Sequence, residues 1–189
     1  KMTQKEFEEF RAKFAEWRMS PIAFIRDIWG LTPERDNTKF VKDKNLTWQQ
    51  HDILLAVEKG LRGEAPKKIS VRTGHGIGKT TAFSWIILWY LMCFYESQAS
   101  CTAPTSQQMF DVLWKEVKKW IDRMPKWAKD KYEWTSSYVR FVEKPETWFA
   151  RSAKARKEAP VSFAGIHGEN VLLGGDEACG IPEEIFESG

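Results

Sequence analysis

Residues 68–81 read KISVRTGHGIGKTT, and the apolar run AFSWIILWYLMCFY follows at residues 82–95. The residues 68–71 predict a short strand, and the glycines at 74, 76 and 78 predict a tight turn after it. The apolar character of residues 79–95 predicts a buried helix. The run is shorter than the roughly 18–20 residues that a membrane span needs, so we expect a core helix and no membrane partner.

The segments on the carboxyl side alternate between strands and helices. Strands are expected at residues 99–103, 138–142, 147–150, 161–164 and 171–173. A helix is expected at residues 106–123, with an apolar face of Met109, Val112, Leu113, Val117, Trp120 and Ile121. This order is typical of an α/β layered fold. We therefore expect a mainly parallel central sheet flanked by helices.

The segments on the amino side are expected to be helical. Aromatic residues recur at helical spacing in residues 3–18, where Thr3 and Glu6 can form a capping box. Further helices are expected at residues 21–29 and 47–61, the second capped by Thr47. The chain therefore divides into an N-terminal helical extension, residues 1–45, and a main domain, residues 46–189.

The composition is that of a globular protein whose charge is unevenly distributed. The chain has 189 residues and a net charge of +3, enough for one domain with a core. Residues 151–157 hold four basic residues and no acid, whereas residues 168–189 hold six acids and no Lys or Arg. The asymmetry indicates a site that handles charge. The three cysteines form no CxxC pair, which argues against a disulfide framework and a zinc site.

The glycine-rich turn nearly matches the phosphate-loop (Walker A) template GxxxxGK[ST]. Gly78, Lys79 and Thr80 match its end, whereas Thr73 stands where the template has its first glycine. The backbone N–H groups of such a loop, and the helix N-terminus after it, bind phosphate oxygens. Lys79 would reach the β- and γ-phosphates of a nucleotide, and the Thr80 hydroxyl would bind Mg²⁺. A glycine-rich turn without a ligand is the competing interpretation.

Residues 171–178, VLLGGDEA, read as an apolar strand with two acids at its carboxyl end, a Walker B pattern. Asp176 would serve the magnesium ion, and Glu177 would orient or deprotonate the attacking water. Gly174 and Gly175 stand where bulky residues are usual, so we expect a weakened strand and a gap in the packing. A solvated strand end is the competing interpretation.

Three segments together resemble the large terminase subunit of tailed bacteriophages: RTGHGIGKTT at 72–81, CTAPTSQQMFDVLW at 101–114 and VLLGGDEACGIPEEIFE at 171–187. Members of that family are ATPases that drive double-stranded DNA into a procapsid. The resemblance implies an additional-strand (RecA-like) P-loop NTPase fold that uses ATP and Mg²⁺. It further implies double-stranded DNA, a portal protein and a small terminase subunit as partners, and a homo-oligomeric ring at the procapsid portal in the host cytoplasm.

The resemblance also implies roles for individual residues. ATP would be bound by Gly74, His75, Gly76, Ile77, Gly78, Lys79, Thr80 and Thr81, and Mg²⁺ by Thr80 and Asp176. Glu177 would be the catalytic base, with Lys79 and Arg72 acting on the phosphates. The family has an adenine-binding glutamine before the phosphate loop, and Gln50 in TWQQHDIL, residues 47–54, is the candidate, with Gln49 as the alternative. A polar helix surface would also account for both glutamines.

The basic segment RSAKARK, residues 151–157, allows three interpretations. Arg151 or Arg156 would be an arginine supplied to the ATP site of a neighbouring subunit, the segment would bind DNA phosphates, or it would be a solvated loop. The family also carries a coupling motif and a nuclease domain after the Walker B acids. Because the sequence stops at Gly189, we expect a truncated ATPase domain without nuclease activity.

Two other functions share the same motifs. A superfamily 2 helicase or repair translocase would also have the phosphate loop, the paired acids and the glutamine motif. A nucleotide-gated binding module would have them without appreciable turnover.

Overall fold

The computed structural model describes residues 3–33, 44–72, 74, 76–105, 107, 109–154, 166 and 168–176. The chain forms two compact units, residues 1–82 and residues 83–189, and each is described by itself. Among the described residues, no helix is both long enough and apolar enough to cross a membrane.

Within its described residues, the first unit contains three complete helices and a short parallel strand pair. The helices are α1 (Gln4–Met19), α2 (Pro21–Trp29) and α3 (Trp48–Leu61), and the pair is β1 (Thr32–Pro33) with β2 (Asn45–Leu46). The expected capping box of Thr3 and Glu6 is present at the start of α1, and Thr47 caps α3. The helices expected at residues 3–18, 21–29 and 47–61 are therefore confirmed.

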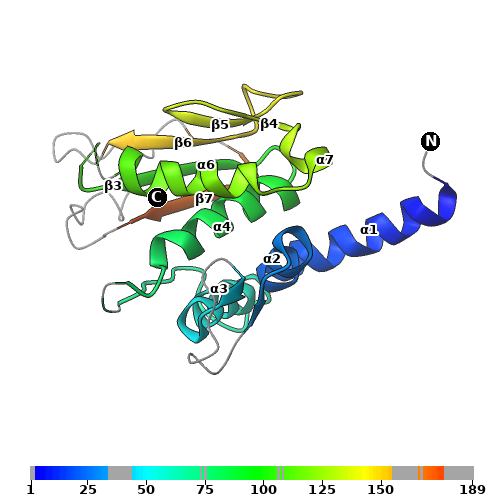
Figure 1. Ribbon diagram of the computed structural model, residues 1–189, viewed down its shortest axis with the longest axis horizontal. Helices are drawn as coiled ribbons and strands as arrows, with labels where there is room; N and C mark the ends of the chain where they lie inside the picture. Colours follow the sequence, from blue (N-terminus) through cyan, green and yellow to red (C-terminus); the bar gives the residue numbers. More distant parts are fainter. Residues whose placement is uncertain are drawn as a thin grey trace. The chain divides into compact units, whose positions relative to one another are not determined.

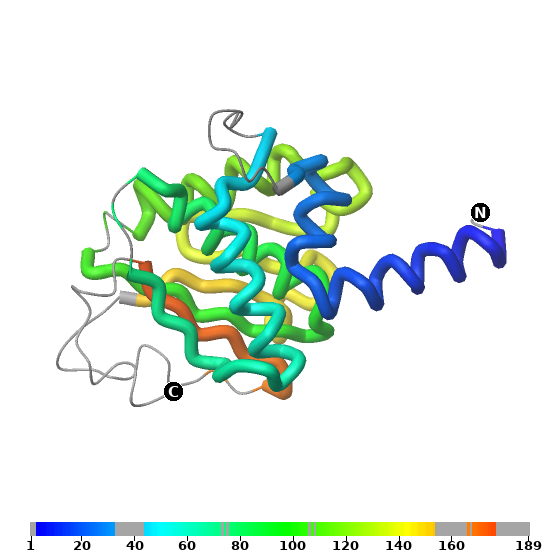
Figure 2. The backbone as a smooth tube through the Cα atoms, turned by 90° about the horizontal axis from the view of Figure 1, so that it is seen from below, coloured from blue at the N-terminus to red at the C-terminus, as the bar shows by residue number. Residues whose placement is uncertain are grey.

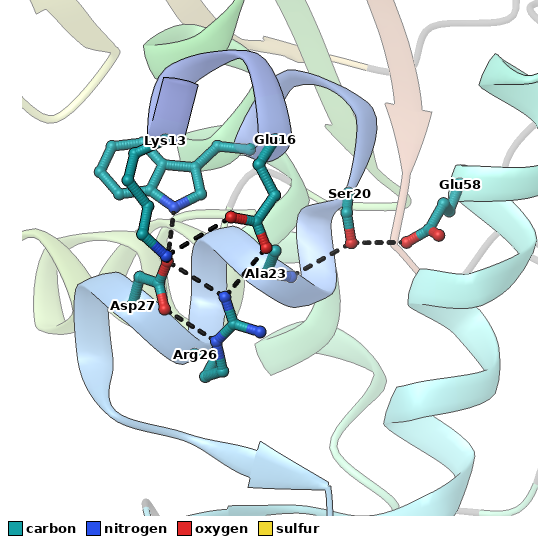
Figure 3. Close-up of polar contacts among 8 residues, drawn as sticks. Lys13, Glu16, Ser20, Ala23, Arg26, Asp27 and Glu58 are labelled. Atoms are coloured by element: carbon teal, nitrogen blue, oxygen red, sulfur yellow. Dashed lines mark hydrogen bonds and ion pairs between the residues drawn. The ribbon is translucent and has the colours of Figure 1, made fainter. Parts of the chain in front are cut away.

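A polar network joins α1 to α2 (Figure 3). The Asp27 carboxylate accepts from Arg26 Nε at 2.7 Å, from Lys13 Nζ at 2.9 Å and from Trp17 Nε1 at 3.0 Å. The Arg26 guanidinium and then the Lys13 ammonium hold the pKa of the Asp27 carboxyl well below its usual range. A separate hydrogen bond of 2.6 Å runs from Ser20 Oγ to the buried Glu58 carboxylate of α3. Short-range polar contacts thus fix the helices of this unit to one another.

The second unit is built on a five-stranded sheet in the order β4-β5-β6-β3-β7. Its strands are β3 (Gln98–Ala103), β4 (Tyr132–Trp134), β5 (Tyr138–Phe141), β6 (Phe149–Lys154) and β7 (Val171–Gly175). β3 pairs in parallel with β6 and β7, and the arrows of β6 and β7 point the same way in Figure 1. The tube trace shows β7 running beside β3 (Figure 2).

The expectation of a mainly parallel sheet is wrong, because β4, β5 and β6 pair antiparallel and the sheet is mixed. The reason lies in the connections. Short turns join these three strands, and a short turn can join only antiparallel neighbours, whereas a parallel pair needs a long crossover. The broader expectation of an α/β fold is confirmed.

Helices in the second unit supply most of its aromatic core. They are α4 (Lys79–Cys93), which belongs to this unit from Phe83 onward, a π-helical segment η2 (Met109–Trp114), α6 (Lys115–Asp122) and α7 (Lys126–Lys129). Trp85 of α4 and Trp120 of α6 meet edge to face, with ring centroids 5.0 Å apart. Val112 was expected on the apolar face but is 49% exposed. The π-helical segment has more residues per turn than an α-helix, which rotates that side chain away from the core.

The prediction of a strand at residues 68–71 is also wrong. These residues have no strand structure and are exposed, including Ile69 at 38% and Val71 at 37%. A strand is held by hydrogen bonds to a neighbouring strand, and the segment pairs with none among the described residues. The strand expected at residues 161–164 lies outside the described residues.

Candidate functional site

The glycine-rich loop has the backbone geometry that its composition predicts. Gly76 and Gly78 adopt positive φ angles of 84° and 81°, a region that residues with a Cβ atom rarely enter. Gly74 does not adopt a left-handed φ, and a Cβ there would have no neighbour within 4 Å. Alternating left-handed residues can turn successive N–H groups toward one side of a loop, and such a concavity binds anions.

The loop leads directly into α4, whose first two residues are Lys79 and Thr80. Lys79 Nζ donates a 2.9 Å hydrogen bond to the carbonyl oxygen of Gly74, so its side chain folds back over the loop. Lys79, Thr80 and Thr81 are each partly exposed. A cationic side chain, a hydroxyl and the N-terminal end of a helix dipole therefore occur within one turn, and all three favour an anion.

Gln50, in the first turn of α3, contacts the same loop. Its Nε2 donates to the carbonyl oxygen of Gly78 at 3.2 Å, while its Oε1 accepts from Thr47 N at 3.0 Å. The side chain is only 5% exposed. A Cβ added at Gly78 would lie 2.2 Å from Gln50 Nε2, so a larger residue would displace the end of the Gln50 side chain, and the positive φ of Gly78 favours glycine in addition.

Asp176 follows the last residue of β7. Its backbone N–H donates to the carbonyl oxygen of Thr102 at 2.9 Å, which continues the pairing of Thr102 with Gly175. Asp176 is thus held where the parallel strands β3 and β7 end. Ligands of α/β sheets bind at this edge, at the C-terminal ends of the strands.

Gly174, one of the two glycines before Asp176, does not leave the expected gap. A Cβ at Gly174 would lie 2.3 Å from Cζ of Phe83, so the aromatic ring of Phe83 occupies the space that a side chain would take. That expectation is corrected: the glycine permits a close approach between helix and strand.

The remaining candidates are distributed as follows. Arg72 is exposed and precedes the loop, and Ile77 is partly exposed within it. Arg151 lies inside β6, where it pairs with Ser100 of β3 and Tyr138 of β5 and is half-buried. The loop residues and Gln50 belong to the first unit, and Asp176 and Arg151 to the second. His75, Glu177 and Arg156 lie outside the described residues.

Magnesium is the metal that the sequence motifs predict. No group of three or more His, Cys, Asp or Glu residues is placed to hold a metal within the described parts of the chain. Mg²⁺ is usually held by one or two protein oxygen ligands together with waters and substrate phosphates. Thr80 of the first unit and Asp176 of the second each carry an oxygen atom of this kind, and the binding of Mg²⁺ by these residues stays a prediction.

The contact between Gln50 and the loop was not predicted from the sequence. The sequence did carry a signal for the hydrogen bond between Gln50 and Thr47. The spacing Thr47-x-x-Gln50 is that of a capping box, which places the glutamine side chain against the start of the helix. The hydrogen bond from Gln50 to Gly78 joins residues far apart in the sequence and has no local signature.

No protein-family model matches the chain. The chain is similar to a protein of Enterobacteria phage P7 described as "Probable terminase, large subunit", with 26% identity over 185 residues. The match covers 94% of this chain and 33% of that protein, so the chain spans about a third of the length of its relative. The likeness extends over nearly the whole chain and supports the resemblance to large terminase subunits that the three motif segments indicate.

Proposed function

We propose that the chain is the ATP-hydrolysing motor domain of a viral DNA-packaging terminase, which couples ATP hydrolysis to the movement of double-stranded DNA into a procapsid. The observation that carries the proposal is the loop geometry. Gly76 and Gly78 adopt left-handed φ angles immediately before a helix that starts with Lys79 and Thr80. The similarity to the phage P7 protein supports the packaging role.

In this proposal each residue has a defined task. The Lys79 ammonium and the loop N–H groups bind the β- and γ-phosphates of ATP. The Thr80 hydroxyl and the Asp176 carboxylate hold Mg²⁺, which neutralises charge on the phosphates. Glu177 accepts a proton from the attacking water. Arg72 or an arginine from a neighbouring subunit, Arg151 or Arg156, stabilises the charge that develops during transfer.

The partners follow from the packaging role. Double-stranded DNA is the cargo, and the portal protein and the small terminase subunit are the assembly partners in the host cytoplasm. The motor would work as a homo-oligomeric ring on the portal. The basic segment at residues 151–157 has the charge needed for DNA phosphates.

The test is steady-state ATP hydrolysis with Mg²⁺ by the chain and by Glu177→Gln. The amide keeps the size of the carboxyl group but cannot accept a proton, so turnover should fall by about a hundredfold or more. Glu169→Gln is the matched control, because Glu169 is an exposed acid just before β7 and its loss should leave turnover unchanged.

Equal turnover in Glu177→Gln and the unmodified chain would remove Glu177 as the base. ATP-dependent release of a strand from a tailed duplex would place the chain with the helicases instead of the packaging motors.

A further inference from the structure

We propose that Gln50 is a positioning residue that holds the phosphate loop at Gly78, and that it does not read the adenine base. The inference rests on the proposed function in that the loop is taken to bind nucleotide phosphates. Its evidence is separate, since it comes from the contacts of the Gln50 side chain.

Both ends of the Gln50 amide are already engaged within the protein. The Oε1 atom accepts from the backbone N–H of Thr47, and the Nε2 atom donates to the carbonyl oxygen of Gly78. These partners fix the orientation of the amide, because one is a donor and the other an acceptor. With 5% of the residue exposed, little of the amide remains accessible to the edge of a base.

The Gly78 carbonyl group is the point at which the loop becomes a helix. Its oxygen accepts the backbone N–H of Ala82 at 3.0 Å, the first hydrogen bond of α4, as well as Gln50 Nε2. The turn closed by that bond contains Lys79 and Thr80. A contact that fixes the Gly78 peptide therefore fixes the backbone that carries both phosphate-binding side chains.

The neighbouring glutamine provides the contrast. Gln49 precedes Gln50 in α3 and is partly exposed, whereas Gln50 is buried. Two residues of the same type thus stand side by side in different surroundings. A substitution at each separates the effect of the loop contact from the effect of changing a glutamine in the first turn of α3.

Gln50→Glu is the informative variant. Glutamate can still accept from Thr47 N and complete the capping box, but it brings a carboxylate oxygen against the Gly78 carbonyl oxygen in place of a donor. Gln49→Glu adds the same charge one residue away and is the control. Gln50→Met, which has similar length and no polar group, is the second variant if the charge prevents folding.

The first measurement is hydrogen–deuterium exchange of the protein without nucleotide, followed at the amides of residues 78–82. We expect exchange about fivefold faster in Gln50→Glu or Gln50→Met, the scale of one lost hydrogen bond. Exchange and the melting temperature in Gln49→Glu should stay at the values of the unmodified chain. Unchanged exchange at residues 78–82 in both Gln50 variants would overturn the proposal.

The second measurement compares the binding of fluorescent ATP and GTP analogues. If Gln50 positions the loop, its variants lose affinity for both by a similar factor, about fivefold, and the ratio of the two dissociation constants does not change. A Gln50 variant that loses ATP binding selectively would show that the amide reads the base, which would overturn the proposal. Absence of binding to the unmodified chain would contradict the proposed function, while the exchange experiment would still decide the role of Gln50.

Discussion

Gly174 is a residue whose importance lies in the side chain that it lacks. The Phe83 ring of α4 lies where a Cβ would be, with Cζ 2.3 Å from that position and Cε2 2.5 Å from it. Neither atom is at the end of a flexible chain, because an aromatic ring moves as a whole. The glycine therefore lets α4 approach the strand that leads to Asp176.

The corresponding variant is Gly174→Ala. The added methyl group displaces the Phe83 ring, and overpacking of this kind costs about 1–3 kcal/mol in the free energy of unfolding, measured by urea denaturation. Combining it with Phe83→Leu should recover part of the loss, because the smaller side chain makes room.

Gly168→Ala is the control for that variant. Its nearest neighbour would be Gln98 at 3.7 Å, an ordinary van der Waals distance, so its stability should not change. Equal losses in Gly174→Ala and Gly168→Ala would show that the Phe83 contact does not explain the glycine.

At the scale of elements, the pair α1 and α2 depends on the Asp27 carboxylate. Arg26, Lys13 and Trp17 donate to it, and the pKa of this carboxyl is below the ordinary value of 3.8. A carboxyl whose pKa is depressed by folding stabilises the protein above its pKa in the unfolded chain. The stabilisation is lost as the pH falls toward the folded pKa.

Asp27→Asn should therefore lower the free energy of unfolding by about 1.5–3 kcal/mol at neutral pH, the range for hydrogen bonds to charged groups. The difference from the unmodified chain should shrink at about pH 3, where protonation begins to remove the same charge. Urea denaturation of both proteins at neutral pH and at about pH 3 measures this difference in the free energy of unfolding.

Glu9→Gln serves as the comparison, because Glu9 is exposed and its ion pair with Lys5 is 3.9 Å long. Such a pair contributes little. A destabilisation by Asp27→Asn that is as large at acidic as at neutral pH would contradict the assigned role of the charge.

The elements that sequence reasoning predicted are those with local signals. The capping boxes at Thr3 and Thr47 and the left-handed Gly30 mark helix ends within a few residues of sequence. The failures have non-local causes. Residues 68–71 have strand composition, but a strand also needs a partner, and nothing near them in sequence tells whether one is present.

The orientation of Val112 was missed for a different reason. A helical period of 3.6 places it on the apolar face, but η2 is π-helical, and an insertion that widens one turn has no reliable signature in composition. The strand β4 was not predicted from the sequence because Tyr132–Trp134 is only three residues long. Its place in the sheet comes from antiparallel pairing with β5.

At the scale of the whole molecule, the sequence identified the candidate residues better than it identified the contacts that hold them. Composition and spacing identify the glycine loop, Lys79 and Asp176. The support comes from contacts between distant segments, such as Gln50 with Gly78 and Asp176 with Thr102. These depend on packing, which no spacing rule describes.

The central claim is that residues 74–81 bind the phosphates of ATP, and its most direct test is calorimetric titration of the chain and of Lys79→Ala with MgATP and with AMP. The chain should bind MgATP much more tightly than AMP, because AMP lacks the β- and γ-phosphates. Lys79→Ala should weaken MgATP binding by about tenfold or more, the scale of a charge-assisted hydrogen bond, while Lys68→Ala should not, since Lys68 lies in the exposed segment before the loop. MgATP binding of equal strength in Lys79→Ala and the unmodified chain, or no binding to the unmodified chain, would contradict the account.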